Sequence, residues 1–253
     1  MRLFGFGLAF LCMAVVGTAD AQTVTVLDDF NGPGGGSGFT QTVILDTDAS
    51  TPAATTTLDP NLGIGVGEFN TVGLGDIEQS AWVFAGQSLA IGETLALDLN
   101  VGGNQDIGIF VADTALTAAS LADSDTRDDL VVSFARNATQ AANAVFDDTF
   151  PGGNTGNLGG SNFPFSGVFI THTAADSFDL GFIDGTGAFV TERSFVANGG
   201  NSGSVIGIYT DIRANGNLGD FDNFRIISPV PEPTSMMVLG LAGGIATLRR
   251  RRR

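Results

Sequence analysis

The feature that most limits how this chain can fold is its division into short segments of alternating polar and apolar residues, separated by glycine-rich turns. Thr23–Leu27 reads Thr-Val-Thr-Val-Leu, the alternation of a strand with one buried face. The 36 glycines interrupt any longer helical periodicity. Eleven segments are therefore predicted to be strands: Thr23–Leu27, Gln41–Leu45, Ser80–Phe84, Thr94–Val101, Ile107–Val111, Leu130–Phe134, Gly167–Thr173, Ser177–Ile183, Ala188–Val196, Ser204–Ile212 and Asp220–Ile227.

Two segments depart from this pattern. Thr114–Ala122 is alanine-rich and follows Asp113, a possible helix N-cap, but its acidic exit suits a loop equally well. Pro151–Ser166 is rich in glycine, asparagine and proline, and we interpret it as a long surface loop. The flanks of that loop each have too few strands for a core of their own, so one domain over residues 22–228 is the simpler interpretation.

Many short strands and few helices favour an all-β fold, an antiparallel β-sandwich of jelly-roll-like type. The two ends of the domain add a detail. An early Leu27-Asp28-Asp29-Phe30 and a late segment over residues 219–226 resemble the terminal strands of carbohydrate-binding and lectin-like sandwiches. That resemblance implies that the first and last strands of the domain pair side by side.

The charge of the domain is strongly negative. Of the 27 acids only Asp20 and Glu232 lie outside residues 22–228, and six of the 11 arginines do, which leaves 25 acids against 5 arginines and a formal charge of −20. Such a surface repels nucleic acid and anionic lipid and attracts divalent cations. The sequence therefore excludes nucleic-acid binding.

Acids at the two ends of the domain are the candidate metal ligands. If the terminal strands pair, Asp28 and Asp29 approach Asp220, Asp222 and Asn223. Calcium takes six to eight oxygen ligands from carboxylates, amides and carbonyls, so a structural Ca²⁺ site there is one hypothesis. The alternative is that these side chains cap strand ends and form Asx-turns.

Catalytic signatures are weak in this sequence. The single cysteine, Cys12, lies in the apparent signal peptide, which excludes disulfides, thiolate catalysis and cysteine-ligated zinc in the exported chain. The single histidine, His172, is predicted to be a solvent-facing strand residue. Trp82 is interpreted as a core residue, with stacking on a sugar ring as the alternative. Acids are so abundant here that pairs of carboxylates arise by chance, and a pair is therefore no specific sign of a glycosidase. We expect that the protein is not an enzyme.

The N-terminus is typical of a secretory signal peptide, assigned to residues 1–21. Arg2 precedes an apolar stretch from Leu3 to Val16, and Ala19 and Ala21 form the small-x-small pattern that signal peptidase recognises. We expect cleavage after Ala21, with Gln22 as the mature N-terminus, or otherwise an uncleaved membrane helix.

The C-terminus, residues 229–253, combines three features. A proline-rich step holds the backbone extended, a short apolar segment follows from Met236 to Leu248, and a basic cluster ends the chain. The apolar segment spans only about 20 Å as a helix, short of the roughly 30 Å hydrocarbon core, so it inserts marginally. The step consists of Val230, Pro231, Glu232 and Pro233, and the membrane-stop cluster of Arg249, Arg250, Arg251, Arg252 and Arg253.

Together these features resemble the PEP-CTERM tail of Gram-negative bacteria. The resemblance covers about a tenth of the chain and implies transient inner-membrane anchoring and processing by an exosortase; a plain tail anchor is the alternative. It further implies a role at the cell surface or in the extracellular polysaccharide matrix. For the body of the protein, residues 22–228, we expect a non-catalytic structural or matrix-interaction role. The alternatives are a carbohydrate-binding module, with or without calcium, an ice-binding protein and a glycoside hydrolase.

Overall fold

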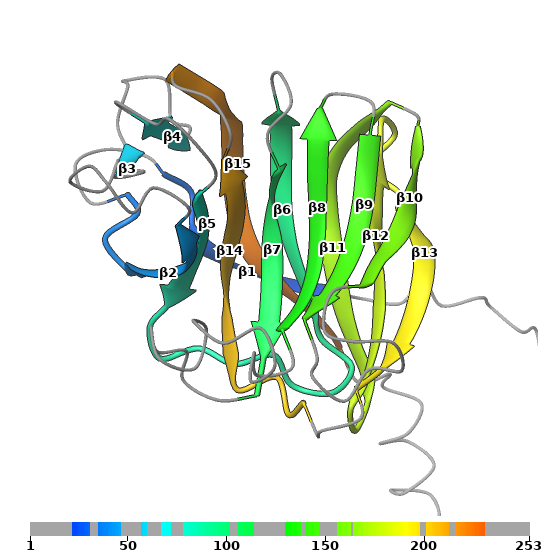
Figure 1. Ribbon diagram of the computed structural model, residues 1–253. Helices are drawn as coiled ribbons and strands as arrows, with labels where there is room; N and C mark the ends of the chain where they lie inside the picture. The colour runs from blue at the N-terminus through cyan, green and yellow to red at the C-terminus, as the bar shows by residue number, and fades with distance from the viewer. Residues whose placement is uncertain are drawn as a thin grey trace, which may run out of the picture. The chain divides into compact units, whose positions relative to one another are not determined.

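The computed structural model describes most of the body of the chain (Figure 1). The described residues are 22–30, 35–46, 57–59, 67–71, 78–101, 106–113, 130–137, 140–146, 156–162, 164–197, 201–212 and 216–230. The predicted signal peptide, the candidate helix Thr114–Ala122 and the tail beyond Val230 lie outside them. By their contacts, residues 23–228 form one compact unit, and residues 1–22 with 229–253 form another.

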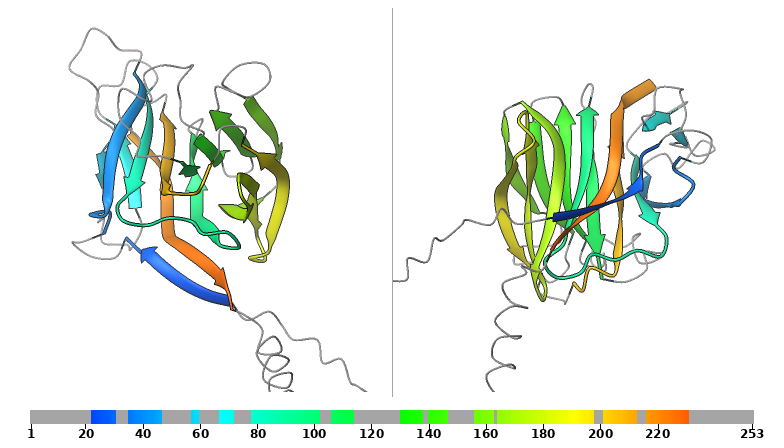
Figure 2. Two further views of the ribbon diagram at one scale, coloured as in Figure 1. Left: turned by 90° about the horizontal axis from the view of Figure 1, so that it is seen from below. Right: turned by 180° about the vertical axis from the view of Figure 1, so that it is seen from behind.

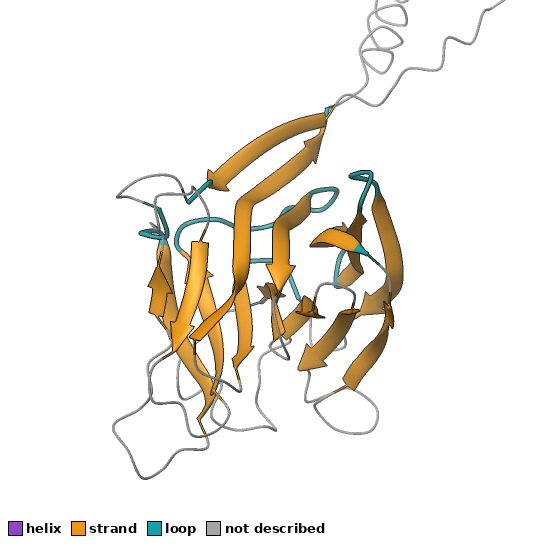
Figure 3. Cartoon of the chain, turned by 90° about the horizontal axis from the view of Figure 1, so that it is seen from above, coloured by secondary structure: helices purple, strands orange, loops and turns teal. Residues whose placement is uncertain are grey.

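All regular elements of the described residues are β-strands, which form two antiparallel sheets (Figure 3). Sheet A has eight strands, in the order β13-β12-β11-β6-β15-β4-β3 with β1 paired to β15. Their bounds are β1 Gln22–Asp28, β3 Thr57–Asp59, β4 Gly67–Thr71, β6 Thr94–Val101, β11 Phe165–Ala174, β12 Ser177–Asp184, β13 Phe189–Val196 and β15 Gly216–Pro229.

Sheet B has seven strands, in the order β10-β9-β8-β7-β14-β5-β2. Their bounds are β2 Phe39–Asp46, β5 Glu78–Phe84, β7 Asp106–Ala112, β8 Leu130–Asn137, β9 Gln140–Phe146, β10 Gly156–Asn162 and β14 Val205–Ile212. The chain crosses repeatedly between the sheets, since β5, β7 and β14 lie in sheet B and β6, β11 and β15 in sheet A. The predicted antiparallel β-sandwich is confirmed.

The core fills the space between the inner faces of the sheets. Val168 and Ile170 of sheet A and Ile206 and Ile208 of sheet B are fully buried in one cluster, two residues apart along each strand as the β period requires. At one end of the core, phenylalanines from distant segments pack ring against ring, with centroids 4.8–6.0 Å apart. These rings belong to Phe30, Phe39, Phe84, Phe221 and Phe224.

The interpretation of Pro151–Ser166 as one surface loop was wrong. Gly156–Asn162 is strand β10, which pairs antiparallel with β9 and forms the edge of sheet B, and β11 begins at Phe165. Strand pairing needs only backbone N–H and C=O groups, so a segment of glycine and asparagine can take an edge position without apolar side chains. Three further strands have no predicted counterpart: β3 and β4, which pair with each other, and β9, which pairs with β8 and β10.

The first and last strands of the body pair, as predicted. β15 is 14 residues long, and one of its edges pairs with β6 over residues 219–227. The opposite edge pairs first with β4, over residues 216–221, and then with β1. Figures 2 and 3 show β1 and the later half of β15 as a two-stranded ribbon that projects from the rest of the two sheets.

Candidate functional site

The outer face of sheet A, which points away from the core, carries three rows of side chains that run across the strands. Each row follows from the printed register of β6, β11, β12 and β13. The first row is Asp98, Gly167, Ile183 and Phe189. The second is Ala96, Phe169, Gly181 and Thr191. The third is Thr94, Thr171, Asp179 and Ser194.

Phe169 and Phe189 form the aromatic centre of this face. Their rings meet edge to face, with centroids 5.1 Å apart and planes at 72°. Phe169 is 2% exposed and lies across Gly181, where an added Cβ would come within 2.8 Å of the ring. Phe189 lies above and is 41% exposed. The missing side chain at Gly181 thus lets one ring lie flat as the base for a second, exposed ring.

The third row supplies polar groups next to the row of Phe169 and two rows from Phe189. The Thr94 and Thr171 hydroxyls lie 2.8 Å apart, and the Ser194 hydroxyl donates to the Asp179 carboxylate at 2.6 Å. We call the aromatic pair and this row together the platform: Phe169, Phe189, Thr94, Thr171, Asp179 and Ser194. The platform combines an exposed apolar ring with hydroxyl and carboxylate groups in fixed positions.

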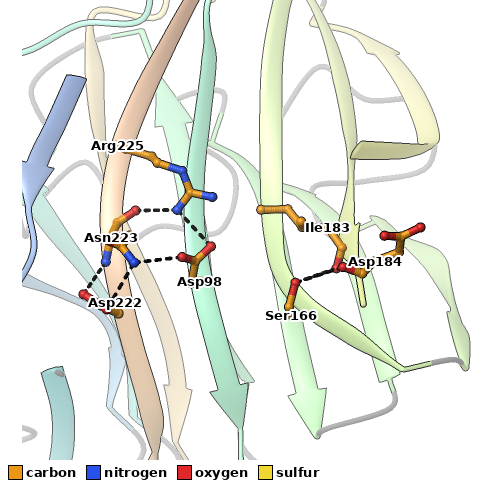
Figure 4. Close-up of polar contacts among 7 residues, drawn as sticks. All are labelled: Asp98, Ser166, Ile183, Asp184, Asp222, Asn223 and Arg225. Atoms are coloured by element: carbon orange, nitrogen blue, oxygen red, sulfur yellow. Dashed lines mark hydrogen bonds and ion pairs between the residues drawn. The ribbon is translucent and has the colours of Figure 1, made fainter. Parts of the chain in front are cut away.

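A polar cluster lies on β6 and β15 next to the platform (Figure 4). Arg225 forms a 2.8 Å ion pair with Asp98 and donates to the backbone carbonyl of Asn223. The Asn223 side-chain amide donates to Asp98 at 3.0 Å and to Asp222 at 3.1 Å. One arginine and one amide therefore hold two carboxylates side by side.

Asp222 is the member of this cluster whose pKa is raised. Its burial raises its pKa, and the nearby negative charges of Asp98 and Asp29 raise it further, against the lowering effects of the Asn223 backbone N–H and of Arg225. Asn223 itself has a φ of 53°, in the left-handed region that asparagine tolerates. The arrangement keeps a third carboxylate, Asp29, within electrostatic range of Asp222.

The structure brings the predicted calcium ligands only partly together. Asp222 and Asn223 contact each other, and Asp29 is an electrostatic neighbour. Asp28 instead accepts hydrogen bonds from the backbone N–H groups of Phe30 and Gly36, at 2.8 and 2.6 Å. Asp220 pairs in register with Asn100 of β6. Within the described ranges no three acidic, histidine or cysteine side chains are grouped as metal ligands, so calcium stays a prediction.

Several carboxylates serve as loop clamps, the role that the Asx-turn alternative assigned to the acids. Asp184 at the β12–β13 turn accepts hydrogen bonds from the Thr186 hydroxyl and from the backbone N–H groups of Ala188 and Thr186, and these bonds lower its pKa. Asp113 accepts from the backbone N–H and the hydroxyl of Ser202, across 89 positions of sequence. Such hydrogen bonds within the chain explain part of the high aspartate content without a bound ligand.

His172 is not solvent-facing, contrary to the prediction. It is 2% exposed, stacks on Phe178 with centroids 4.7 Å apart, and its Nδ1 lies 2.8 Å from the Leu89 carbonyl oxygen. The threonines on either side of His172 indicated a solvent-exposed strand. Side chains alternate between the two faces of a strand, however, so His172 lies on the inner face together with Ile170. Its Nε2 is buried and has no hydrogen-bond partner.

Trp82 is a core residue, as its main interpretation held. It is 6% exposed, and its indole N–H donates to the Thr210 hydroxyl at 3.2 Å. The aromatic side chains of the platform, in contrast, went unnoticed at the sequence level. Their signal was the alternation of Phe169 with Val168 and Ile170, which puts Phe169 on the opposite face from the core.

Two hollows of about 470 Å³ each lie away from the platform. One is on sheet B and is lined by Thr40, Thr42, Val83, Ser204 and Val205 among others. The other is lined by residues 26–29 of the β1 end, the loop residues Gly35, Ser37 and Gly38, and Phe84. The first hollow has no carboxylate among its lining residues. The second is lined by Asp28 and Asp29, and Asp28 accepts the two backbone hydrogen bonds described above.

The predicted processing residues fall almost entirely outside the described residues. Val230, 37% exposed, directly follows β15, and the remainder of the Pro-Glu-Pro step, the arginine cluster, Ala19 and Ala21 are not described. In the part of the chain that is described, no helix is long and apolar enough to cross a membrane.

Comparison with known proteins identifies the tail. A family described as the PEP-CTERM protein-sorting motif matches residues 229–253. The motif implies an exported protein that exosortase recognises, with a surface or extracellular destination in a Gram-negative bacterium. No curated protein sequence matches the chain.

Among solved structures, the β-glucanase of Bacillus licheniformis is similar in fold. It is 10% identical, the comparison covers 84% of this chain and 100% of that chain, and the TM-score is 0.47. A likeness this distant carries no argument about the activity of this chain.

Proposed function

We propose that the body is a non-catalytic protein of the cell surface or extracellular matrix, delivered through its sorting tail. The observation that carries this proposal is that the sorting motif starts at residue 229, where β15 ends. The last strand of the sandwich therefore leads straight into the tail. Processing at the tail would release or attach the folded body as one piece.

The use of the carboxylates supports a non-catalytic body. Asp28, Asp113 and Asp184 hold loops, and Asp98 is neutralised by Arg225 at 2.8 Å. General acid–base chemistry on a glycosidic bond needs two carboxylates in a cleft, one of them free to hold a proton. In the folded state, these carboxylates are already engaged in hydrogen bonds or in an ion pair.

The platform favours a second candidate function, binding of extracellular polysaccharide. An exposed aromatic ring stacks on the apolar face of a sugar, and neighbouring hydroxyls and carboxylates bond to its hydroxyl groups. Phe189 provides the ring, and the Asp179–Ser194 and Thr94–Thr171 pairs provide the polar groups. With a body charge of −20, the ligand is expected to be a neutral glycan rather than an acidic one.

Fractionation of the native host tests the sorting proposal. With exosortase present, we expect a protein that begins at Gln22, lacks Arg249–Arg253 and leaves the inner membrane. Without exosortase, the arginines should persist and the protein should stay in the inner membrane. Persistence of the arginine cluster in both strains would show that the tail is an anchor and would contradict the proposal.

A glycan array tests the binding candidate separately. Phe189→Ala should reduce binding to any glycan hit by about tenfold, since a stacking contact of about 1–1.5 kcal/mol is lost. Ile91→Ala is the matched control, because Ile91 is also exposed, at 59%, but lies outside the platform. Repeating the array with calcium and with EDTA tests the predicted Ca²⁺. Absence of any hit, or equal losses for both variants, would remove the platform as a binding site and leave the sorting proposal intact.

A further inference from the structure

Strand β1 has a free edge that carries none of the usual protection. Among the described strands β15 is its only partner. Residues 22–26 are all exposed, with Val24 at 54% and Val26 at 49%. A strand exposed on both faces and paired on one side presents unpaired N–H and C=O groups as a template for another strand.

The opposite edge of the same sheet shows how this protein protects an edge. β13 carries the adjacent charges Glu192 and Arg193, and its register with β12 shifts at this point. Charges and bulges are the common devices that block edge-to-edge pairing. Gln22–Val26, in contrast, contains no charged side chain, no proline and no glycine, and its Thr-Val-Thr-Val run has high β propensity.

We propose that the free edge of β1 binds β1 of a second copy of this chain, joining two A sheets across a two-fold axis. The distribution of charge favours this contact between two copies over contacts through the acidic surface. A body with a charge of −20 repels its copies wherever acidic surfaces meet, whereas Gln22–Leu27, the part of β1 before Asp28, brings together two segments without charged side chains. Most homo-oligomers are two-fold dimers with self-complementary interfaces, and an antiparallel strand pair is self-complementary.

The sequence of β1 fits one register best. With Thr25 on the two-fold axis, Val24 of each copy lies opposite Val26 of the other, and Thr23 lies opposite Leu27. Two valine pairs and a threonine pair then form the contact, and no carboxylate lies opposite another. β-branched cross-strand pairs of this kind are favourable in antiparallel sheets.

Cysteine cross-linking tests this register directly. All variants carry Cys12→Ala, so that the introduced cysteine is the only one in the chain. In the proposed dimer the two Thr25→Cys side chains lie directly opposite each other, with Cα atoms about 4.5–5.5 Å apart, within disulfide range. We expect Thr25→Cys to form a disulfide-linked dimer at least about tenfold faster than Thr191→Cys, an exposed position on the protected edge strand β13. Equal rates would show random collision and overturn the proposal.

A charge exchange provides the second measurement, by sedimentation of the exported protein. V24E/V26E places two pairs of like charges across the axis and should raise the dimer dissociation constant by about tenfold or more. V24E/V26K places opposite charges across the same axis and should restore the dimer. Fluorescence of the buried Trp82 checks that each variant is folded. A monomeric wild-type protein, a V24E/V26E dimer as stable as wild type, or no rescue by V24E/V26K would each overturn the proposal.

Discussion

Removal of the Asp28 carboxylate is the substitution whose effect on stability the structure defines most closely. Asp28 ends β1 and accepts two backbone hydrogen bonds, from Phe30 at 2.8 Å and from Gly36 at 2.6 Å. Phe30 is fully buried, has a φ of 49° and packs edge to face on Phe221. Asp28 therefore holds a buried ring in a backbone conformation that a bulky residue adopts only when its surroundings enforce it.

The magnitude follows from the two bonds. A hydrogen bond to a charged acceptor contributes about 1.5–3 kcal/mol, and the lower end applies because Asp28 is only half-buried. We expect Asp28→Ala to lower the free energy of unfolding by about 3 kcal/mol and Asp28→Asn, which keeps one acceptor oxygen, by about half of that. Asp179→Ala, which loses one exposed bond to Ser194, is the control and should cost less than about 0.5 kcal/mol.

Urea unfolding followed by the fluorescence of Trp82, the only tryptophan, measures these differences. The loop-clamp account requires the same loss in calcium and in EDTA. A loss confined to calcium-containing buffer would show that Asp28 acts as a metal ligand. A loss below about 0.5 kcal/mol for Asp28→Ala would refute the account itself.

Three further substitutions test other contacts. Gly181→Ala should destabilise the protein by about 1–3 kcal/mol or more in urea, because the new Cβ would lie 2.1 Å from the Val190 carbonyl oxygen and 2.8 Å from the Phe169 ring. Because the pKa of Asp222 is raised above its usual 3.8 in the folded protein, ionisation of this group costs stability as pH rises through the folded-state pKa. Asp222→Asn should therefore be more stable than wild type at neutral pH, with a gain that shrinks as pH falls toward 3.8; a constant difference would contradict this. His172→Phe keeps a ring beside Phe178 but removes the donor to the Leu89 carbonyl, and should cost about 1–2 kcal/mol in thermal unfolding; an unchanged Tm would show that this bond is unimportant.

The sequence predicted those parts of the fold in which side chains alternate. Thr94–Val101 was predicted with the bounds that β6 has, because buried leucines at positions 95, 97 and 99 alternate with more polar residues. β10 has no apolar side chain except Leu158, and its pairing with β9 depends on backbone groups that every residue has. Such a strand leaves no periodic signal.

The site was harder to predict than the fold, since it depends on register between strands. Phe169 and Phe189 lie 20 positions apart and meet only because β11, β12 and β13 align Gly181 between them. The pairing of β1 with β15 was predictable from the acidic motifs at the two ends, but the specific partners of Asp28 were not. A loop glycine eight positions away, Gly36, supplies one of its two donors.

The pairing of β1 with β15 also fixes the order in which the chain can fold. These strands are separated by roughly 190 residues, so the entropy lost on closing that loop must be offset by contacts that form earlier. During export the N-terminal strand emerges first and its partner emerges last. For nearly the whole passage, the exposed Val24 and Val26 therefore belong to a segment whose partner strand has not yet emerged.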